Sequence, residues 1–181
     1  PRVDWGVEEY ADILIKLLEN LKIKNVTYFG HSFGGAIGMI LSTRPNLVVN
    51  KLILCDSAFK RPNKTTKIPP FLKSVLFRTK SIRIWTYRIF FPHSDIAKHP
   101  HLESNFKKIM QQDLSTLPPK IATPTLIIWG EKDTFTPVAW AHELHQSITN
   151  SVLKIIPGAR HGLPLKNPEI VAKEIRAFLY S

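Results

Sequence analysis

Hydrophobic and polar positions follow two patterns along this chain: one has the period of a helix, and the other is a set of short continuous apolar runs. Residues 7–21 place apolar side chains on one face of a helix and charged side chains on the other. Short, mostly apolar runs follow at residues 26–29 (VTYF), 51–55 (KLILC), 125–129 (TLIIW) and 152–156 (VLKII). Continuous runs of this length are typical of strands that are buried on both faces of a parallel sheet.

Helices are predicted between these runs. Small and apolar residues at 34–41 indicate a helix that directly follows the first run. Thr136-Pro137 has the form of an N-cap followed by a first-position proline, and predicts a helix to about Ile148. Asn167-Pro168 repeats this pair before a last helix, whose predicted inner face is Val171, Ile175, Phe178 and Leu179. Alternating strands and helices predict an α/β fold with a mostly parallel sheet of about four strands.

The composition changes in the middle of the chain. Residues 60–120 hold 13 of the 25 lysines and arginines, and their only acidic residues are Asp95, Glu103 and Asp113. The same segment holds seven of the 14 prolines and none of the eight glycines. We therefore predict a core domain formed by residues 1–57 and 119–181, interrupted by a basic helical insertion at 58–118. Within the insertion, helices are expected inside 71–91 and over 102–113.

Overall composition excludes several classes of protein. The apolar fraction of 44% and the charged fraction of 22% are those of a globular protein, not of a disordered, collagen-like or coiled-coil chain. No apolar run approaches the roughly 18 to 20 residues of a membrane-spanning helix. The single cysteine, Cys55, cannot form an internal disulfide, and no zinc-ligand spacing occurs. We expect no metal or organic cofactor, and the absence of a signal-peptide pattern favours a cytoplasmic location.

A Gly-x-Ser-x-Gly motif lies between the first apolar run and the following helix. In this context the serine occupies a tight turn, and the hydroxyl of Ser32 projects above the end of the strand. Gly30 and Gly34 are expected to let the backbone turn without Cβ collisions. The Phe33 N–H, at the start of the helix, can donate to a developing oxyanion. His31 is predicted to pack beside the turn. Ser32 is therefore the candidate nucleophile.

A serine nucleophile needs a general base, and the base needs an orienting carboxylate. Asp133 follows the third apolar run and His161 follows the fourth, so the order along the chain is Ser, Asp, His. The carboxyl ends of parallel strands meet at one edge of a sheet, so we expect the three side chains to converge. Asp56, which directly follows the second run, is kept as an alternative to Asp133 for the carboxylate.

Three stretches resemble the α/β-hydrolase superfamily, in the cap-bearing fold-1 type of serine hydrolase. They are YFGHSFGG at 28–35, PTLIIWGEKD at 124–133 and PGARHG at 157–162. The resemblance implies that Ser32 is the nucleophile, Asp133 the acid and His161 the base, and that Phe33 supplies one oxyanion amide. It also implies that the basic insertion is a helical cap over the active site.

Members of this family normally have further strands, and a His-Gly loop with a second oxyanion amide, before the nucleophile. Here one predicted helix precedes residue 26, and no His-Gly pair occurs before Gly30. We therefore expect the C-terminal part of a longer hydrolase, with weak activity when isolated. The alternative is a short form that pairs the exposed edge strand at 26–29 with another chain.

A serine nucleophile, rather than an aspartate, implies an acyl-enzyme intermediate. The expected reaction is carboxylesterase-like hydrolysis of a small ester with an apolar acyl group; amides, thioesters and carbon–carbon bonds β to a ketone remain alternatives. The basic cap also suggests attraction to an anionic membrane surface, and no nucleic-acid-binding motif is present. The competing prediction is a catalytically impaired hydrolase fragment or a binding module.

Overall fold

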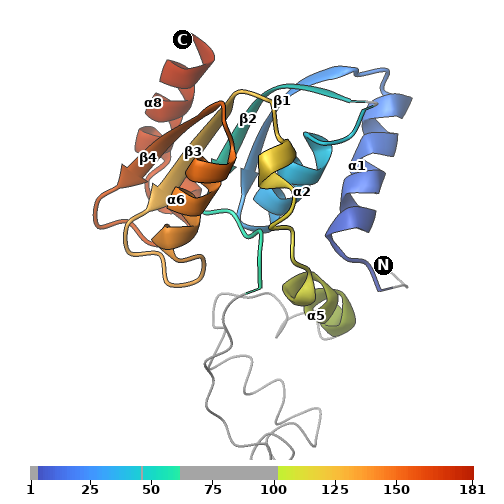
Figure 1. Ribbon diagram of the computed structural model, residues 1–181, viewed down its shortest axis with the longest axis horizontal. Helices are drawn as coiled ribbons and strands as arrows, with labels where there is room; N and C mark the ends of the chain where they lie inside the picture. The colour runs from blue at the N-terminus through green and yellow to red at the C-terminus, as the bar shows by residue number, and fades with distance from the viewer. Residues whose placement is uncertain (1–3, 46, 62–101) are drawn as a thin grey trace, which may run out of the picture. The chain divides into compact units, whose positions relative to one another are not determined.

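The computed structural model describes residues 4–45, 47–61 and 102–181 (Figure 1). The chain divides into two compact units, one formed by residues 7–61 and 112–181 and the other by residues 1–6 and 62–111. We call the first the core unit. In the described part of the second unit, helix α5 spans Glu103–Gln111, within the predicted helix at 102–113. The helices expected inside 71–91 lie outside the described residues, and the cap role of the insertion stays a prediction.

The core unit contains a four-stranded parallel sheet with strand order β1-β2-β3-β4 (Figure 1). Its strands are β1 (Asn25–His31), β2 (Val48–Cys55), β3 (Thr125–Gly130) and β4 (Ser151–Ile156), and each contains one of the predicted apolar runs. In the register, His31 lies opposite Cys55, Cys55 opposite Ile128, and Gly130 opposite Ile156. The carboxyl ends of all four strands therefore meet at one edge, which confirms the predicted α/β fold with a parallel sheet.

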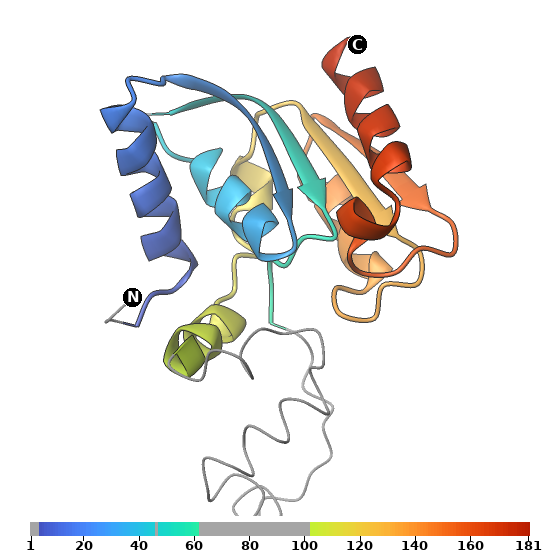
Figure 2. The same ribbon diagram turned by 180° about the vertical axis from the view of Figure 1, so that it is seen from behind.

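Helices flank both faces of this sheet. Helices α2 and α6 pack on one face, and α8 packs on the other; the opposed views of Figures 1 and 2 show α6 and α8 in turn before the strands. The helices of the core unit are α1 (Val7–Asn20), α2 (Phe33–Leu41), the short 3₁₀ helix η3 (Pro118–Lys120), α6 (Val138–Ser147), α7 (Leu163–Lys166) and α8 (Pro168–Leu179). Within the described residues, no helix is both long and apolar enough to cross a membrane.

Burial explains why the strand patterns differ. All six residues of β3 are buried, because this strand lies inside the sheet and is covered on both faces. Strands β1 and β4 form the two edges of the described sheet, and their residues alternate in exposure along most of their length. Phe29 on β1 is 40% exposed. On the α8 face, a buried cluster joins Ile53, Leu126 and Val171, and Ile175 and Phe178 pack against it.

Two predicted apolar faces are only partly buried. Val7 and Ala11 of α1 are buried, whereas Leu17 is 50% and Leu21 59% exposed. Helix α1 packs against α2, and the described residues cover only the start of its apolar face. Leu179, which we placed on the inner face of the last helix, is 37% exposed, because the helix ends there.

Candidate active site

Three loops at the carboxyl edge of the sheet bring the predicted serine, histidine and aspartate together. His161 Nε2 lies 3.1 Å from Ser32 Oγ, and His161 Nδ1 lies 2.7 Å from Asp133 Oδ2. Both distances are those of hydrogen bonds. A carboxylate oxygen only accepts, so Nδ1 carries the proton that is donated to Asp133. The lone pair of Nε2 is then free to accept the hydroxyl proton of Ser32.

The backbone at Ser32 is held in an unusual conformation. Its φ is 52° and its ψ is −114°, in a region that non-glycine residues rarely occupy. The Ser32 N–H donates to the Cys55 carbonyl at 2.9 Å, and the Ser32 carbonyl accepts from the N–H groups of Gly35 and Ala58, each at 3.1 Å. These bonds tie the turn to the end of β2 and compensate for the local strain.

Two glycines of the turn are required by close contacts. A Cβ on Gly30 would lie 2.4 Å from the Gly34 carbonyl oxygen, and a Cβ on Gly35 would lie 1.9 Å from Ser57 Oγ. A Cβ on Gly34 would have only Tyr28 Oη nearby, at 4.0 Å. The expected collision is therefore confirmed at Gly30 and wrong at Gly34. The second tight position is Gly35, because the first turn of α2 passes directly over the loop after β2.

The amide of Phe33 is placed where an oxyanion donor is needed. Phe33 is the first residue of α2, so its N–H has no acceptor within the helix. The partial positive charge at the start of a helix also favours negative charge at this position. The ring of Phe33 packs edge-on against Tyr10 of α1, with the ring centres 5.2 Å apart. The role of Phe33 as an oxyanion donor stays a prediction that this placement supports.

Asp133 is held as a charged carboxylate by four hydrogen bonds. Its Oδ1 accepts from the N–H groups of Phe135 at 2.8 Å and Thr136 at 3.0 Å. Its Oδ2 accepts from His161 Nδ1 and from the Thr136 hydroxyl, each at 2.7 Å. Burial of Asp133 acts to raise its pKa, but the hydrogen bonds from His161 and Thr136 outweigh it, so the pKa lies below its ordinary value.

Thr136 is a residue of the site that the sequence analysis missed. We predicted Thr136 as the N-cap of the following helix, but Pro137 occupies that position and no side-chain capping bond forms. The Thr136 hydroxyl donates to Asp133 Oδ2 instead; it also lies 3.1 Å from the Asp56 carbonyl oxygen and 3.3 Å from His161 Nδ1. The Asp-x-x-Thr spacing was the available signal, because an aspartate that accepts from the second and third following N–H groups itself closes such a turn.

Asp56, the alternative carboxylate, has a different set of partners. It is fully buried, and its φ is 44°. Its Oδ1 accepts from the Gly130 N–H at 2.9 Å, and its Oδ2 accepts from the Leu163 N–H at 3.4 Å. Asp56 thereby joins the ends of β2 and β3 to the start of α7. The geometry favours Asp133, which contacts the His161 ring, over Asp56 as the orienting carboxylate.

Two further rings flank His161. The His31 ring lies 5.0 Å from the His161 ring, and the Phe135 ring lies 5.3 Å from it on a tilted plane. His31 does pack beside the turn, as predicted. Its Nε2 is buried and has no hydrogen-bond partner within the described part of the chain, and the nearest carboxylate oxygen, Asp56 Oδ2, is 3.7 Å away. That separation is too long for a hydrogen bond.

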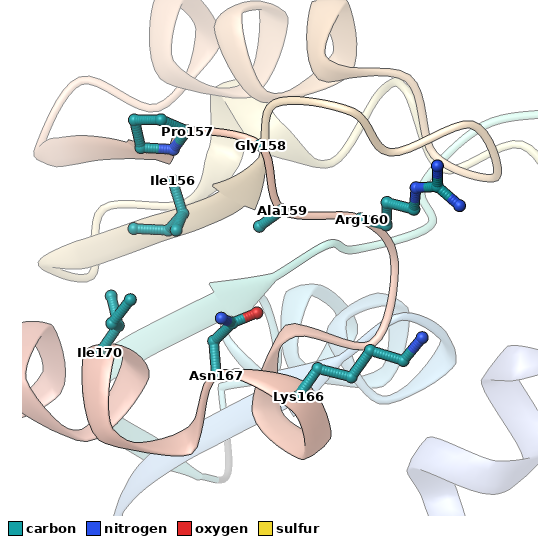
Figure 3. A pocket seen from close by; sticks show the side chains of 8 residues that line it. All are labelled: Ile156, Pro157, Gly158, Ala159, Arg160, Lys166, Asn167 and Ile170. Carbon is teal, nitrogen blue, oxygen red and sulfur yellow. The ribbon is translucent and has the colours of Figure 1, made fainter.

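A pocket of about 370 Å³ opens beside the loop that carries His161 (Figure 3). It lies between the residues that follow β4 and the start of α8, with Ile156 and Ile170 at one end and the side chains of Arg160 and Lys166 extending at the other. The remaining lining residues are Pro157, Gly158, Ala159 and Asn167. Neither Ser32 nor Asp133 lines this pocket, so it is not the place where a substrate carbonyl would meet the serine.

Comparison with known proteins gives a consistent family signal. A sequence model described as the alpha/beta hydrolase family matches residues 1–174. The uncharacterized hydrolase YugF of Bacillus subtilis is 25% identical over 198 aligned residues, which cover 97% of this chain and 72% of YugF. The bifunctional esterase/perhydrolase DCH of Acinetobacter calcoaceticus is 24% identical, with 97% of this chain and 74% of that protein covered.

Solved structures agree with the observed fold. The enol-lactonase from Burkholderia xenovorans LB400 has a TM-score of 0.76 at 22% identity, with 100% of this chain and 75% of that chain covered. At this identity the likeness concerns the fold alone. The chain is shorter than its curated relatives: it spans 72% of YugF and 58% of a mycobacterial relative that is also 25% identical.

Proposed function

Because the chain belongs to the alpha/beta hydrolase family, we propose that it is a serine hydrolase that cleaves carboxylic esters through an acyl-enzyme. The observation that carries this proposal is the hydrogen-bonded line from Ser32 Oγ through His161 to Asp133, with separations of 3.1 and 2.7 Å. The name of the Acinetobacter relative, an esterase/perhydrolase, supports ester substrates. We also propose that the acyl group of the ester substrate is apolar.

Acylation begins when Ser32 Oγ attacks the ester carbonyl carbon while His161 Nε2 takes the hydroxyl proton. The carbonyl oxygen becomes an oxyanion, to which the Phe33 N–H donates; one such donor contributes about 10²–10³ to turnover. The charged Asp133 stabilises the imidazolium and keeps its Nδ1 proton in place. When the tetrahedral intermediate collapses, the alkoxide leaves with the proton from His161 Nε2, and an ester of Ser32 remains.

Deacylation repeats these steps with water as the nucleophile. His161 Nε2 removes a proton from a water molecule, whose oxygen attacks the acyl carbon and forms a second oxyanion. Collapse of this intermediate breaks the bond to Ser32 Oγ, which regains its proton from His161. The products are a carboxylic acid and the alcohol released earlier. The low pKa of Asp133 suits this cycle, because the residue must remain ionised while the imidazole gains and loses a proton.

A fluorophosphonate probe tests the proposal directly. The probe should label Ser32, and labelling should disappear in Ser32→Ala and His161→Ala. Ser42→Ala is the matched control, because the Ser42 hydroxyl donates to the Gly38 carbonyl at the end of α2, outside the site. A protein that is folded by circular dichroism yet unlabelled would overturn the proposal and favour a non-catalytic binding module. Hydrolysis of p-nitrophenyl esters of increasing chain length then measures the preference for the acyl group.

A further inference from the structure

The clearest unused chemical group near the site is the imidazole of His31. Its Nε2 is buried, and within the described residues nothing donates to it or accepts from it. Buried polar atoms of this kind are rare in folded proteins, and each calls for a physical explanation. The ring faces the carboxylate of Asp56, with Nε2 and Oδ2 separated by 3.7 Å.

A third group completes a metal-ligand set around this nitrogen. His31, Asp56 and His161 each offer one ligand atom, and these three atoms all lie within 4.8 Å of one another. With zinc bonds of about 2.0–2.2 Å, ligand atoms in a tetrahedral site lie about 3.4 Å apart. The His31–Asp56 separation is already close to this value, and the wider separations need to close by at most about 1.4 Å. Rotation of the partly exposed His31 and His161 side chains can supply such a shift.

We propose that His31, Asp56 and His161 form a site for Zn²⁺, or for another divalent ion that prefers imidazole, and that the bound ion inhibits the enzyme. Two imidazoles and one carboxylate are a donor set that zinc uses, with a water molecule as the fourth ligand. Asp56 is already oriented by the N–H groups of Gly130 and Leu163, as ligating carboxylates are in established metal sites.

Inhibition follows from the two hydrogen bonds that His161 makes. If the ion takes Nε2, His161 can no longer accept the proton of Ser32. If it takes Nδ1, that nitrogen can no longer donate to Asp133. Either way the line from Ser32 to Asp133 is broken at the base. This part of the inference rests on the proposed serine hydrolase function, whereas binding of the ion does not.

Isothermal titration calorimetry with Zn²⁺ tests binding without reference to activity. The wild-type chain should bind one ion, and His31→Ala should weaken binding by at least about 10- to 100-fold, because loss of a residue that only supports a metal ligand already costs that much and His31 is itself a ligand. His142→Ala is the matched control, because His142 is an exposed histidine on α6 and its loss should leave the affinity unchanged. Asp56→Asn, checked for folding by circular dichroism, should weaken binding as His31→Ala does. Equal affinity of wild type and His31→Ala, or no binding by wild type, would overturn the proposal.

Fluorophosphonate labelling then tests inhibition. Zn²⁺ should slow labelling of the wild type and of His142→Ala, and EDTA should restore the rate. For His31→Ala, the slowing is measured relative to its own metal-free rate and should be much smaller. If Zn²⁺ accelerates ester hydrolysis, and the acceleration persists in Ser32→Ala, the ion is not inhibitory and the protein is a metal-dependent hydrolase. If the folded wild type is never labelled, the proposed function fails, while calorimetry still decides whether the metal site exists.

Discussion

Replacing Asp133 by asparagine tests how the histidine is oriented. The two backbone N–H groups at 2.8 and 3.0 Å from Oδ1 require an acceptor there, so the amide oxygen of the new side chain takes that place. The amide NH₂ then takes the position that Oδ2 has in the wild type and is directed at His161 Nδ1. An NH₂ group donates, so Nδ1 must become the acceptor and the ring proton moves to Nε2.

The expected loss of activity follows from this change of tautomer. With a proton on Nε2, His161 cannot accept the hydroxyl proton of Ser32. A wrong tautomer in a serine triad costs about 10⁴ in kcat, which is about 5.4 kcal/mol of transition-state stabilisation. The fold should change little, because Asn keeps the shape of Asp and the Thr136 hydroxyl can turn to the Asp56 carbonyl oxygen, 3.1 Å away.

The assay compares kcat for p-nitrophenyl ester hydrolysis, and the rate of fluorophosphonate labelling, in wild type, Asp133→Asn and a control. Asp113→Asn is the matched control, because Asp113 also closes a local turn by accepting from the Ser115 N–H, but away from the triad. The reasoning is refuted if Asp133→Asn retains activity within tenfold of wild type. If Asp133→Asn retains activity within tenfold while Asp56→Asn, still folded, loses 10³-fold or more, the orienting carboxylate is Asp56 instead.

Three further results are expected. Gly35→Ala should lower the free energy of unfolding by about 1–3 kcal/mol, because the new Cβ would lie 1.9 Å from Ser57 Oγ. Gly34→Ala should lower it less, because a Cβ there has open space, and thermal denaturation compares the two variants. The pKa of Asp133 is below its ordinary 3.8, so its ionised form stabilises the fold above pH 3.8, and that stability is lost as pH falls through the folded-state pKa. In acid denaturation, the free energy of unfolding of wild type should therefore fall more steeply with decreasing pH than that of Asp133→Asn. Burial, with the nearby carboxylates, raises the pKa of the Cys55 thiol, so Ellman's reagent should react with this single cysteine only when the protein unfolds, and fast reaction of the native protein would contradict the buried position.

The sequence predicted all four strands, because each carries a short run of mostly apolar residues, although only β3 is buried along its whole length and β1 and β4 alternate in exposure. It failed where a side chain's partner comes from a distant segment. Thr136-Pro137 has the sequence of a helix start, and the Thr136 hydroxyl belongs to the site because its partner Asp133 is in turn joined to His161 of a distant loop. The tight contact at Gly35 depends on Ser57, which lies beyond β2. Helix α7 is only four residues long, which is too short for a hydrophobic period to be recognised.

The choice between the two carboxylates shows what strand ends alone can and cannot predict. Parallel register places every residue that follows a strand at one edge of the sheet, which is why residues as distant as Ser32 and His161 could be predicted to meet. Asp56 is the first residue after β2, so it remains at the level of the sheet, where the N–H groups of Gly130 and Leu163 occupy its oxygens. Asp133 lies three residues beyond the end of β3, and this length of loop lets its carboxylate reach the His161 ring. The carboxylate that hydrogen-bonds the histidine is therefore the one that lies further along its loop from the strand end, and the one directly after a strand bonds backbone N–H groups of neighbouring elements.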